Sequence, residues 1–185
     1  MRPLWNKVQP QLAKITQVCA YDRAGFGWSD ARPGPQDANQ IADELHSLLT
    51  QANITGPIVL MGHSIAGVYI RAYASRYPQQ LSGLIFVDGS TPLQEERPAF
   101  KAVLSKGPSP EMQLLVMKSL SILGMPRIKG QCSSVTPGFE PHVGKLLAEE
   151  NCHHPLQALD WSWTASVRPR NDSCGSVRIR DSVVL

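Results

Sequence analysis

The chain has 185 residues, 42% of them hydrophobic and 18% charged, with a formal net charge of +3. This length suits one domain, or one domain with a small insertion, and the composition is ordinary for a soluble globular protein. No apolar run approaches the length of a membrane span, and the first residues show no signal-peptide pattern, so we expect neither a membrane span nor a signal peptide within these residues. Arginines crowd the tail beyond residue 165, but no nucleic-acid-binding motif accompanies them, so we expect a solvated tail.

The four cysteines form no CxxC pair and show no spacing typical of a metal site. Cys19 lies in an apolar run, and we expect it to behave as a small buried hydrophobic residue. Without a targeting segment in the sequence, the default prediction is a reduced, cytoplasmic protein. A targeting segment would be missed if the natural chain extended beyond Met1.

Helix and strand patterns alternate through the first half of the chain. The patterns predict helices at 1–14, 37–52 and 64–76, and strands at 15–21, 58–61 and 84–87. Pro10 should bend or interrupt the first helix. The strands at 58–61 and 84–87 are continuously apolar, as in a parallel sheet that is covered on both faces. We therefore predict an α/β core over residues 1–93.

The pattern changes after residue 93. Prolines separate short helical pieces, of which residues 111–123 give the clearest helical periodicity, and no strand pattern appears. We predict a helical, cap-like insertion over residues 94–165. Residues 166–185 form an irregular tail, whose end at 182–185 could begin a strand.

A serine motif lies between the strand at 58–61 and the helix that follows it. Gly62 and Ala66 are the small residues that a sharp strand-to-helix turn needs two positions before and after Ser64, because larger side chains would collide there. Such a turn exposes the serine hydroxyl, and the Ile65 N–H points to where an oxyanion would form. We predict that Ser64 is a nucleophile with a strained, left-handed backbone, and that Ile65 is the backbone oxyanion donor.

The run DRAGFGWS at residues 22–29 and the elbow at residues 62–66 together resemble the α/β-hydrolase fold family, at the spacing that the family uses. The resemblance covers residues 1–93 almost continuously and makes residues 94–165 similar to the family's helical cap. It implies a serine hydrolase that acts on a small ester or amide through an acyl-enzyme. It implies no cofactor and no metal. The expected partner is a small-molecule substrate, with neither nucleic acid nor a membrane, and the oligomeric state stays open.

The same resemblance identifies parts of the family fold that have no match in this sequence. In the family another strand lies between the equivalents of residues 15–21 and 58–61, and the triad histidine follows the last strand. We therefore predict a partial α/β-hydrolase fold that is weak or inactive as a catalyst alone. The alternative is a truncated or degenerate, non-catalytic fragment, or a binding module. We expect parallel strands, with 84–87 beside 58–61, and either direct pairing of 15–21 with 58–61 or a gap filled by another segment.

Asp88 is the candidate acid. It ends the strand at 84–87, where some lipase-like members of the family hold this residue. The alternative is a structural role, in which Asp88 caps the turn that follows the strand. Asp22, in the glycine-bearing loop, is expected to stabilise that loop rather than to act as an acid.

The histidines offer no assigned base. We expect His46 at the boundary of its helix and His63 beside the nucleophile, where it shapes the pocket. Cys152, His153 and His154 are consecutive, but no further ligand lies at metal spacing, so a cap helix explains them more simply than a metal site. His153 or His154 acting as the base from the cap stays open.

Overall fold

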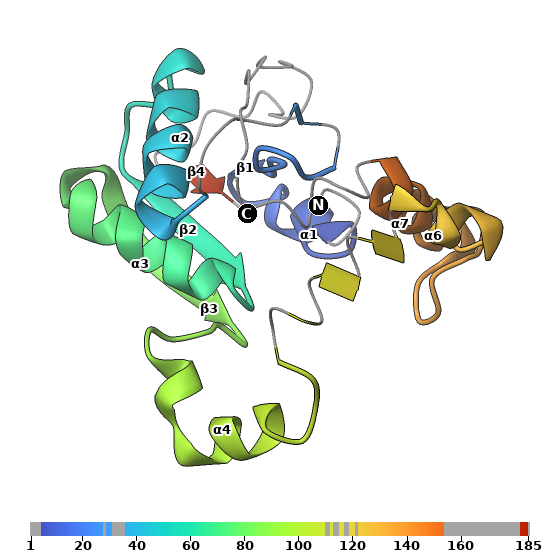
Figure 1. The fold of residues 1–185 in the computed structure, drawn as a ribbon. Helices are drawn as coiled ribbons and strands as arrows, with labels where there is room; N and C mark the ends of the chain where they lie inside the picture. The colour runs from blue at the N-terminus through green and yellow to red at the C-terminus, as the bar shows by residue number, and fades with distance from the viewer. Residues whose placement is uncertain are drawn as a thin grey trace.

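The core of the molecule is a four-stranded parallel sheet with the strand order β1-β4-β2-β3 (Figure 1). The computed structural model describes residues 5–27, 29–30, 36–109, 112, 115–116, 119–120, 122–153 and 182–184. The strands are β1 (Gln17–Cys19), β2 (Ile58–His63), β3 (Leu81–Val87) and β4 (Ser182–Val184). The predicted α/β fold with a parallel sheet is confirmed, and so is the pairing of β3 with β2.

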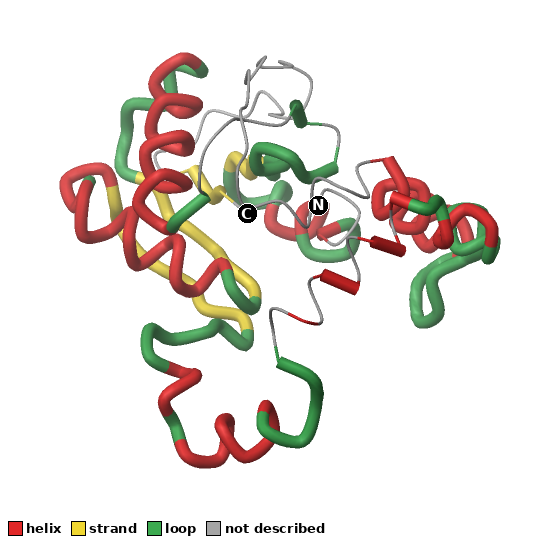
Figure 2. The backbone as a smooth tube through the Cα atoms, viewed as in Figure 1, coloured by secondary structure: helices red, strands yellow, loops and turns green. Residues whose placement is uncertain are grey.

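The helices that pack around the sheet precede β3 in the chain, and further helices follow it in the described residues. Their bounds are α1 (Gln9–Leu12), α2 (Ala38–Gln51), α3 (Ala66–Arg76), α4 (Pro98–Leu104), α6 (Met125–Ile128) and α7 (Pro141–His153). Figure 2 shows helices and loops, without strands, in the described part of residues 94–153. None of the helices in the described ranges is long and apolar enough to cross a membrane.

The two N-terminal helices show how single residues set helix bounds. Asp37 accepts a hydrogen bond from the Gln40 N–H at 2.8 Å, which caps α2 where the sequence predicts its start. The predicted helix over residues 1–14 shortens to α1, with Pro10 in its first turn. Proline lacks an N–H, and only the first turn of a helix can do without that donor, so the helix cannot extend far before Pro10.

β2 is covered on both faces, and alternate residues face opposite sides. Ile58 and Leu60 are each 1% exposed and pack against the inner faces of α2 and α3. Val59 and Met61 pack with β1 residues and with Leu12 of α1 on the other side. In Figure 1, α2 and α3 lie side by side against the sheet. This two-sided burial explains why the strand sequence is continuously apolar.

The C-terminal strand β4 lies in the middle of the sheet. It pairs in parallel with β1, Val18 opposite Val183, and with β2, Val59 opposite Val183. The predicted strand at 182–185 is thus confirmed, and it fills the predicted gap between the first two strands. β4 reaches only Ile58–Leu60 of β2, whereas β3 pairs along the whole of β2.

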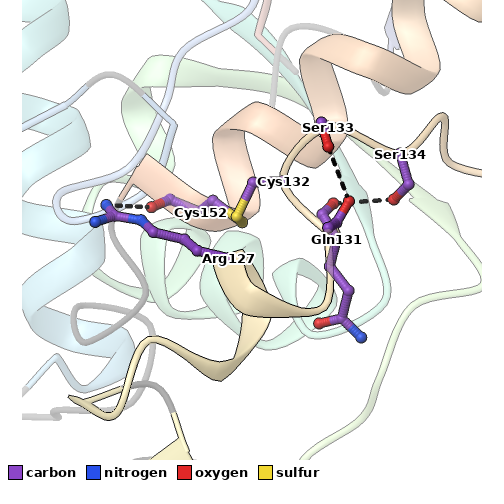
Figure 3. The surroundings of a disulfide bond; sticks show 7 residues. Arg127, Gln131, Cys132, Ser133, Ser134 and Cys152 are labelled. Carbon is purple, nitrogen blue, oxygen red and sulfur yellow. Dashed lines mark hydrogen bonds between the residues drawn. A yellow bond between two sulfur atoms is a disulfide. The ribbon is translucent and has the colours of Figure 1, made fainter.

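A disulfide joins the loop after α6 to the end of α7. Cys132 and Cys152 lie 20 positions apart, with their Cα atoms 5.5 Å from each other. Arg127 of α6 donates from Nη2 to the carbonyl oxygen of Cys152 at 3.4 Å, a second link between the two helices (Figure 3). Cys19 is also disulfide-bonded and only half-buried. The prediction that Cys19 serves as a buried hydrophobic residue was therefore wrong, because its sulfur is covalently paired.

We expect Val183→Pro to lower the free energy of unfolding by about 1–3 kcal/mol, because proline removes the N–H that a middle strand donates and leaves an acceptor unpaired inside the sheet. A urea unfolding curve followed by circular dichroism measures the change. Val183→Ala is the matched control, since it shortens the side chain and keeps the N–H. Equal midpoints for the two variants would contradict the central position of β4.

Candidate active site

Ser64 occupies a sharp turn between β2, which ends at His63, and α3, which begins at Ala66. Its φ angle is 55°, in the left-handed region that residues with a Cβ rarely adopt. Its side chain is exposed. The predicted backbone conformation of Ser64 is confirmed, while its role as a nucleophile stays a prediction.

The turn is tight enough to require small residues on both sides of Ser64. A Cβ on Gly62 would lie 3.1 Å from the backbone carbonyl and the Cβ of Ala66. Any side chain at position 62, or a larger one at position 66, would push β2 and α3 apart. The sequence requirement for small residues at these positions therefore has a direct steric cause.

Three backbone hydrogen bonds hold Ser64 in place. Its N–H donates to the Val87 carbonyl oxygen at 3.2 Å, at the end of β3. Its carbonyl oxygen accepts from the Gly67 N–H at 2.9 Å and from the Ser90 N–H at 2.8 Å. The serine backbone is thus tied both to the helix that follows it and to the neighbouring strand.

Ile65 sits at the N-cap of α3 with φ −56°, a helical conformation. The structure records no acceptor for its N–H within the described ranges. A free N–H at a helix start, one residue after the exposed serine, can donate to a developing negative charge. The predicted position of Ile65 is therefore compatible with an oxyanion donor.

Asp88 follows β3 directly and lies next to the elbow. His63 is opposite Val87 in the β2–β3 register, so Ser64 and Asp88 are the next residues along the two strands. Asp88 has φ 47°, another left-handed residue with a Cβ. Its side chain is exposed, and no described residue hydrogen-bonds to its carboxylate. This geometry fits a turn residue, and Asp88 also lies at the same edge of the sheet as Ser64, so both interpretations stay open.

The structure brings no described histidine onto the Ser64 hydroxyl. His46 stacks on Tyr77 with ring centroids 4.0 Å apart and hydrogen-bonds Gln80, between α2 and the end of α3. His63 is exposed beside Ser64, and His142 is exposed on α7. His153 ends α7, and His154 lies outside the described residues.

Two buried tyrosines near the core cannot replace a histidine. Burial raises the pKa of Tyr21 to about 12, and burial likewise raises that of Tyr73 to about 12. Both phenols therefore keep their protons at neutral pH and cannot act as a base there.

The loop after β1 packs against the elbow helix. The Arg23 guanidinium is buried and lies 4.3 Å from the Phe26 ring centroid and 4.7 Å from that of Tyr69 on α3. The Asp22 carboxylate fills the space beside Gly27, where a Cβ would approach it to 2.5 Å. Asp22 therefore stabilises the loop, as its sequence context predicts.

The described residues contain no group of His, Cys, Asp and Glu side chains that could hold a metal ion. Cys152 is in a disulfide, so its sulfur cannot act as a thiolate ligand.

The end of α3 far from Ser64 is anchored to α2. Asp43 accepts hydrogen bonds from Arg76 Nε at 2.7 Å, Arg76 Nη2 at 2.9 Å and Tyr77 Oη at 2.6 Å. The Tyr77 hydroxyl and then the Arg76 guanidinium hold the pKa of the Asp43 carboxyl below its ordinary value of 3.8. The sequence gives no signal for this cluster, because Asp43 lies 33 positions from Arg76.

A family model identifies the kind of fold, and several known proteins are similar in sequence. A model of the alpha/beta hydrolase fold matches residues 1–109. An uncharacterized protein of Schizosaccharomyces pombe is 39% identical over 126 residues, which cover 68% of this chain and 22% of that protein. Methylesterase 1 of Arabidopsis thaliana is 29% identical over 99 residues, 52% of this chain and 38% of that protein.

A solved structure is also similar. It is a thermophilic esterase from Thermogutta terrifontis with malate bound, at 27% identity and a TM-score of 0.49, and the match covers 75% of this chain and 48% of the esterase. The chain therefore spans less than half the length of each of these relatives.

We expect the stability difference between the parent chain and Asp43→Asn to shrink in acid. The folded-state pKa of Asp43 is lowered, so the stabilisation is complete above the unfolded-state pKa and is lost as the pH falls through the folded value, below about pH 4. Urea midpoints from pH 2 to pH 7 measure it. Because both side chains are more than a third exposed, the effect should be small and weakened by salt.

Arg76→Gln is the matched variant, because it removes the guanidinium and leaves the carboxyl in place. It should lose only part of the pH dependence, because the Tyr77 hydroxyl still donates a hydrogen bond to Asp43 and lowers its pKa. A constant difference between the parent and Asp43→Asn down to pH 2 would contradict a lowered pKa.

Proposed function

Because the chain belongs to the α/β-hydrolase fold family, we propose that it carries the nucleophilic centre of a serine hydrolase that acts on a small ester or amide. The observation that carries the proposal is the left-handed Ser64 at the strand-to-helix turn, followed by the unpaired N–H of Ile65. The similarity to a protein named as a methylesterase supports an ester as the substrate class. The hydrolase activity and the small-molecule substrate are likewise proposals for any longer protein that contains this chain.

In the proposed reaction Ser64 Oγ attacks the carbonyl carbon of the substrate and gives its proton to a histidine. The carbonyl oxygen takes the negative charge, and the Ile65 N–H donates a hydrogen bond to it. The intermediate collapses, the alcohol or amine leaves with the proton, and the acyl group stays on Ser64 Oγ. Water then cleaves this ester bond, which releases the carboxylic acid and restores Ser64.

Asp88 is the proposed candidate for the acid that would orient the histidine. Its place at the end of β3, one strand from Ser64, supports this role. Its left-handed φ of 47° equally supports a structural role in the turn. The proposed reaction needs no metal and no organic cofactor, because the serine supplies the covalent intermediate itself.

A non-catalytic fragment or binding module is the second candidate. The observation that favours it is that no described histidine hydrogen-bonds the Ser64 hydroxyl. An elbow without a base can still present an exposed serine and a free N–H to a ligand, but it cannot turn over efficiently.

The disulfides bear on where the protein resides. Disulfides persist in oxidising compartments and are rare in the cytosol. The Cys132–Cys152 bond and the disulfide at Cys19 support an oxidising compartment rather than the cytoplasm that the sequence suggests by default. We propose the oxidising location.

We expect p-nitrophenyl acetate to acylate Ser64 in a slow, stoichiometric burst, followed by turnover near background. The Ser64 hydroxyl proton passes to hydroxide or to buffer base, and the activated leaving group departs as an anion without a proton, whereas removal of the acyl group needs a base to activate water, and no described residue provides one. Release of p-nitrophenolate at 405 nm (about the absorbance maximum of the ion) follows the burst, and peptide mass spectrometry locates the acetyl group.

Ser64→Ala should abolish the burst, while Ser82→Ala, which removes an exposed serine on β3, should leave it unchanged. A burst that survives Ser64→Ala, or the absence of any acyl adduct, would favour the binding module. Fast, Ser64-dependent turnover would instead indicate a base, and His153 and His154 would be the first residues to replace.

We expect Ile65→Pro to slow acylation of Ser64 by about 10²–10³, because proline removes one oxyanion donor. Proline tolerates φ near −65°, close to the −56° of Ile65, but it also disfavours an α-type backbone in the residue before it, so the variant tests the donor only if the backbone of Ser64 is unchanged. Stopped-flow measurement of the burst rate tests this. Ile65→Ala, which keeps the N–H, should react at a rate close to that of the parent; equal rates for the proline and alanine variants would exclude Ile65 as the donor.

A further inference from the structure

The residues after β3 cross over the start of α3. Asp88 turns the chain with φ 47°, and Gly89 and Ser90 then lie against Gly67 in the first turn of the helix. A Cβ on Gly67 would approach the Ser90 carbonyl oxygen to 2.6 Å and the Gly89 Cα to 3.0 Å. The two backbones therefore meet at a distance that only glycine permits.

Conformational freedom does not explain the glycine at position 67. Gly67 is buried within α3 and is not among the residues with positive φ, so any residue could adopt its backbone angles. Glycine also disfavours a helix relative to alanine. The remaining reason for a glycine is the space that Gly89 and Ser90 occupy.

The contact of Gly67 with Gly89 and Ser90 brings the Ser90 N–H within hydrogen-bond distance of Ser64. The Ser90 N–H donates to the Ser64 carbonyl oxygen at 2.8 Å, and the Val87 carbonyl oxygen accepts from the Ser64 N–H at 3.2 Å. Both backbone polar groups of Ser64 are thus bound by the segment that leaves β3. The left-handed backbone conformation of Ser64 is unfavourable, and a residue keeps such a conformation only where several surrounding contacts hold it in place.

We propose that Gly67 and the Asp88–Ser90 turn are positioning elements that hold Ser64 in its left-handed conformation. Gly67 gives the turn access to the elbow, and the Ser90 N–H fixes the peptide plane that follows Ser64. The expected effect on acylation of Ser64 rests on the proposed function, whereas the expected effect on the backbone conformation of Ser64 does not.

Gly67→Ala tests the proposal against Gly83→Ala. The added methyl at position 67 meets backbone atoms that cannot rotate away, whereas at position 83, within β3, it meets only Val59 Cγ2 at 3.9 Å, an ordinary contact. In the full chain we expect Gly67→Ala to speed hydrogen exchange at the Ser90 amide and to weaken the strong intraresidue HN–Hα NOE that a positive φ gives Ser64. Gly83→Ala should change neither.

The same variants are then acylated with p-nitrophenyl acetate. We expect about a 10²-fold lower burst rate at saturation in Gly67→Ala with little change in the half-saturating concentration, because a displaced nucleophile loses orientation rather than binding. Gly83→Ala should react like the parent.

A second pair of variants isolates the hydrogen bond and covers the case in which Gly67→Ala fails to fold. Ser90→Pro removes the N–H that Ser64 accepts, and Ser90→Ala keeps it. We expect only the proline variant to lose the NOE signature of Ser64 and its burst.

The two readouts separate this inference from the proposed function. If the parent shows no acylation, the serine-hydrolase proposal fails, and the exchange and NOE data still decide whether the turn positions Ser64. Unchanged exchange and an unchanged Ser64 NOE in both Gly67→Ala and Ser90→Pro would overturn the inference, whatever the activity.

Discussion

The left-handed backbone of Ser64 is the constraint on which the surrounding structure depends. A non-glycine residue in this conformation costs about 1–3 kcal/mol, so neighbouring groups have to offset it. Three backbone hydrogen bonds, to Val87, Gly67 and Ser90, each contribute about 0.5–1.5 kcal/mol. They form only if β3 lies beside β2 in its observed register and if the helix starts without a bulky side chain. The exposed hydroxyl therefore follows from contacts among β2, β3 and the first turn of α3.

Because the conformation of Ser64 depends on contacts with β3, it also depends on how β2 is paired within the sheet. β2 carries the elbow, and it can stay straight and buried only if both of its edges have partners. β3 satisfies one edge along its full length, and β4 satisfies the first half of the other. The β2 residues closest to Ser64 pair with β3. The Asp88–Ser90 turn, which also contacts Ser64, follows the same strand.

The sequence predicts those features that local physics determines. Helical spacing over residues 37–52 predicts α2, and Gly62 and Ala66 around Ser64 predict the strained turn. The sequence does not predict the place of β4, because a three-residue strand carries no information about its partners. For the same reason the disulfide at Cys19 and the contact between Gly67 and Ser90 were missed. Gly67 and Ser90 are distant in the chain, and no local pattern marks either their contact or the disulfide bonding of Cys19.

In a serine hydrolase, the turn that positions the serine and the histidine that accepts its proton lie in different parts of the fold. Positioning of the serine and proton transfer can therefore be considered separately. Every contact that shapes Ser64 lies between residues 58 and 90, so the turn can form wherever this segment folds. A proton acceptor is a separate requirement. His46 is held in a stack on Tyr77, and the tyrosines of raised pKa keep their protons. The described geometry therefore supports the positioning of Ser64 more strongly than it supports proton transfer. In a serine hydrolase, attack by the hydroxyl and release of the acyl group both need a proton acceptor, whereas the orientation of the serine and of the Ile65 N–H does not.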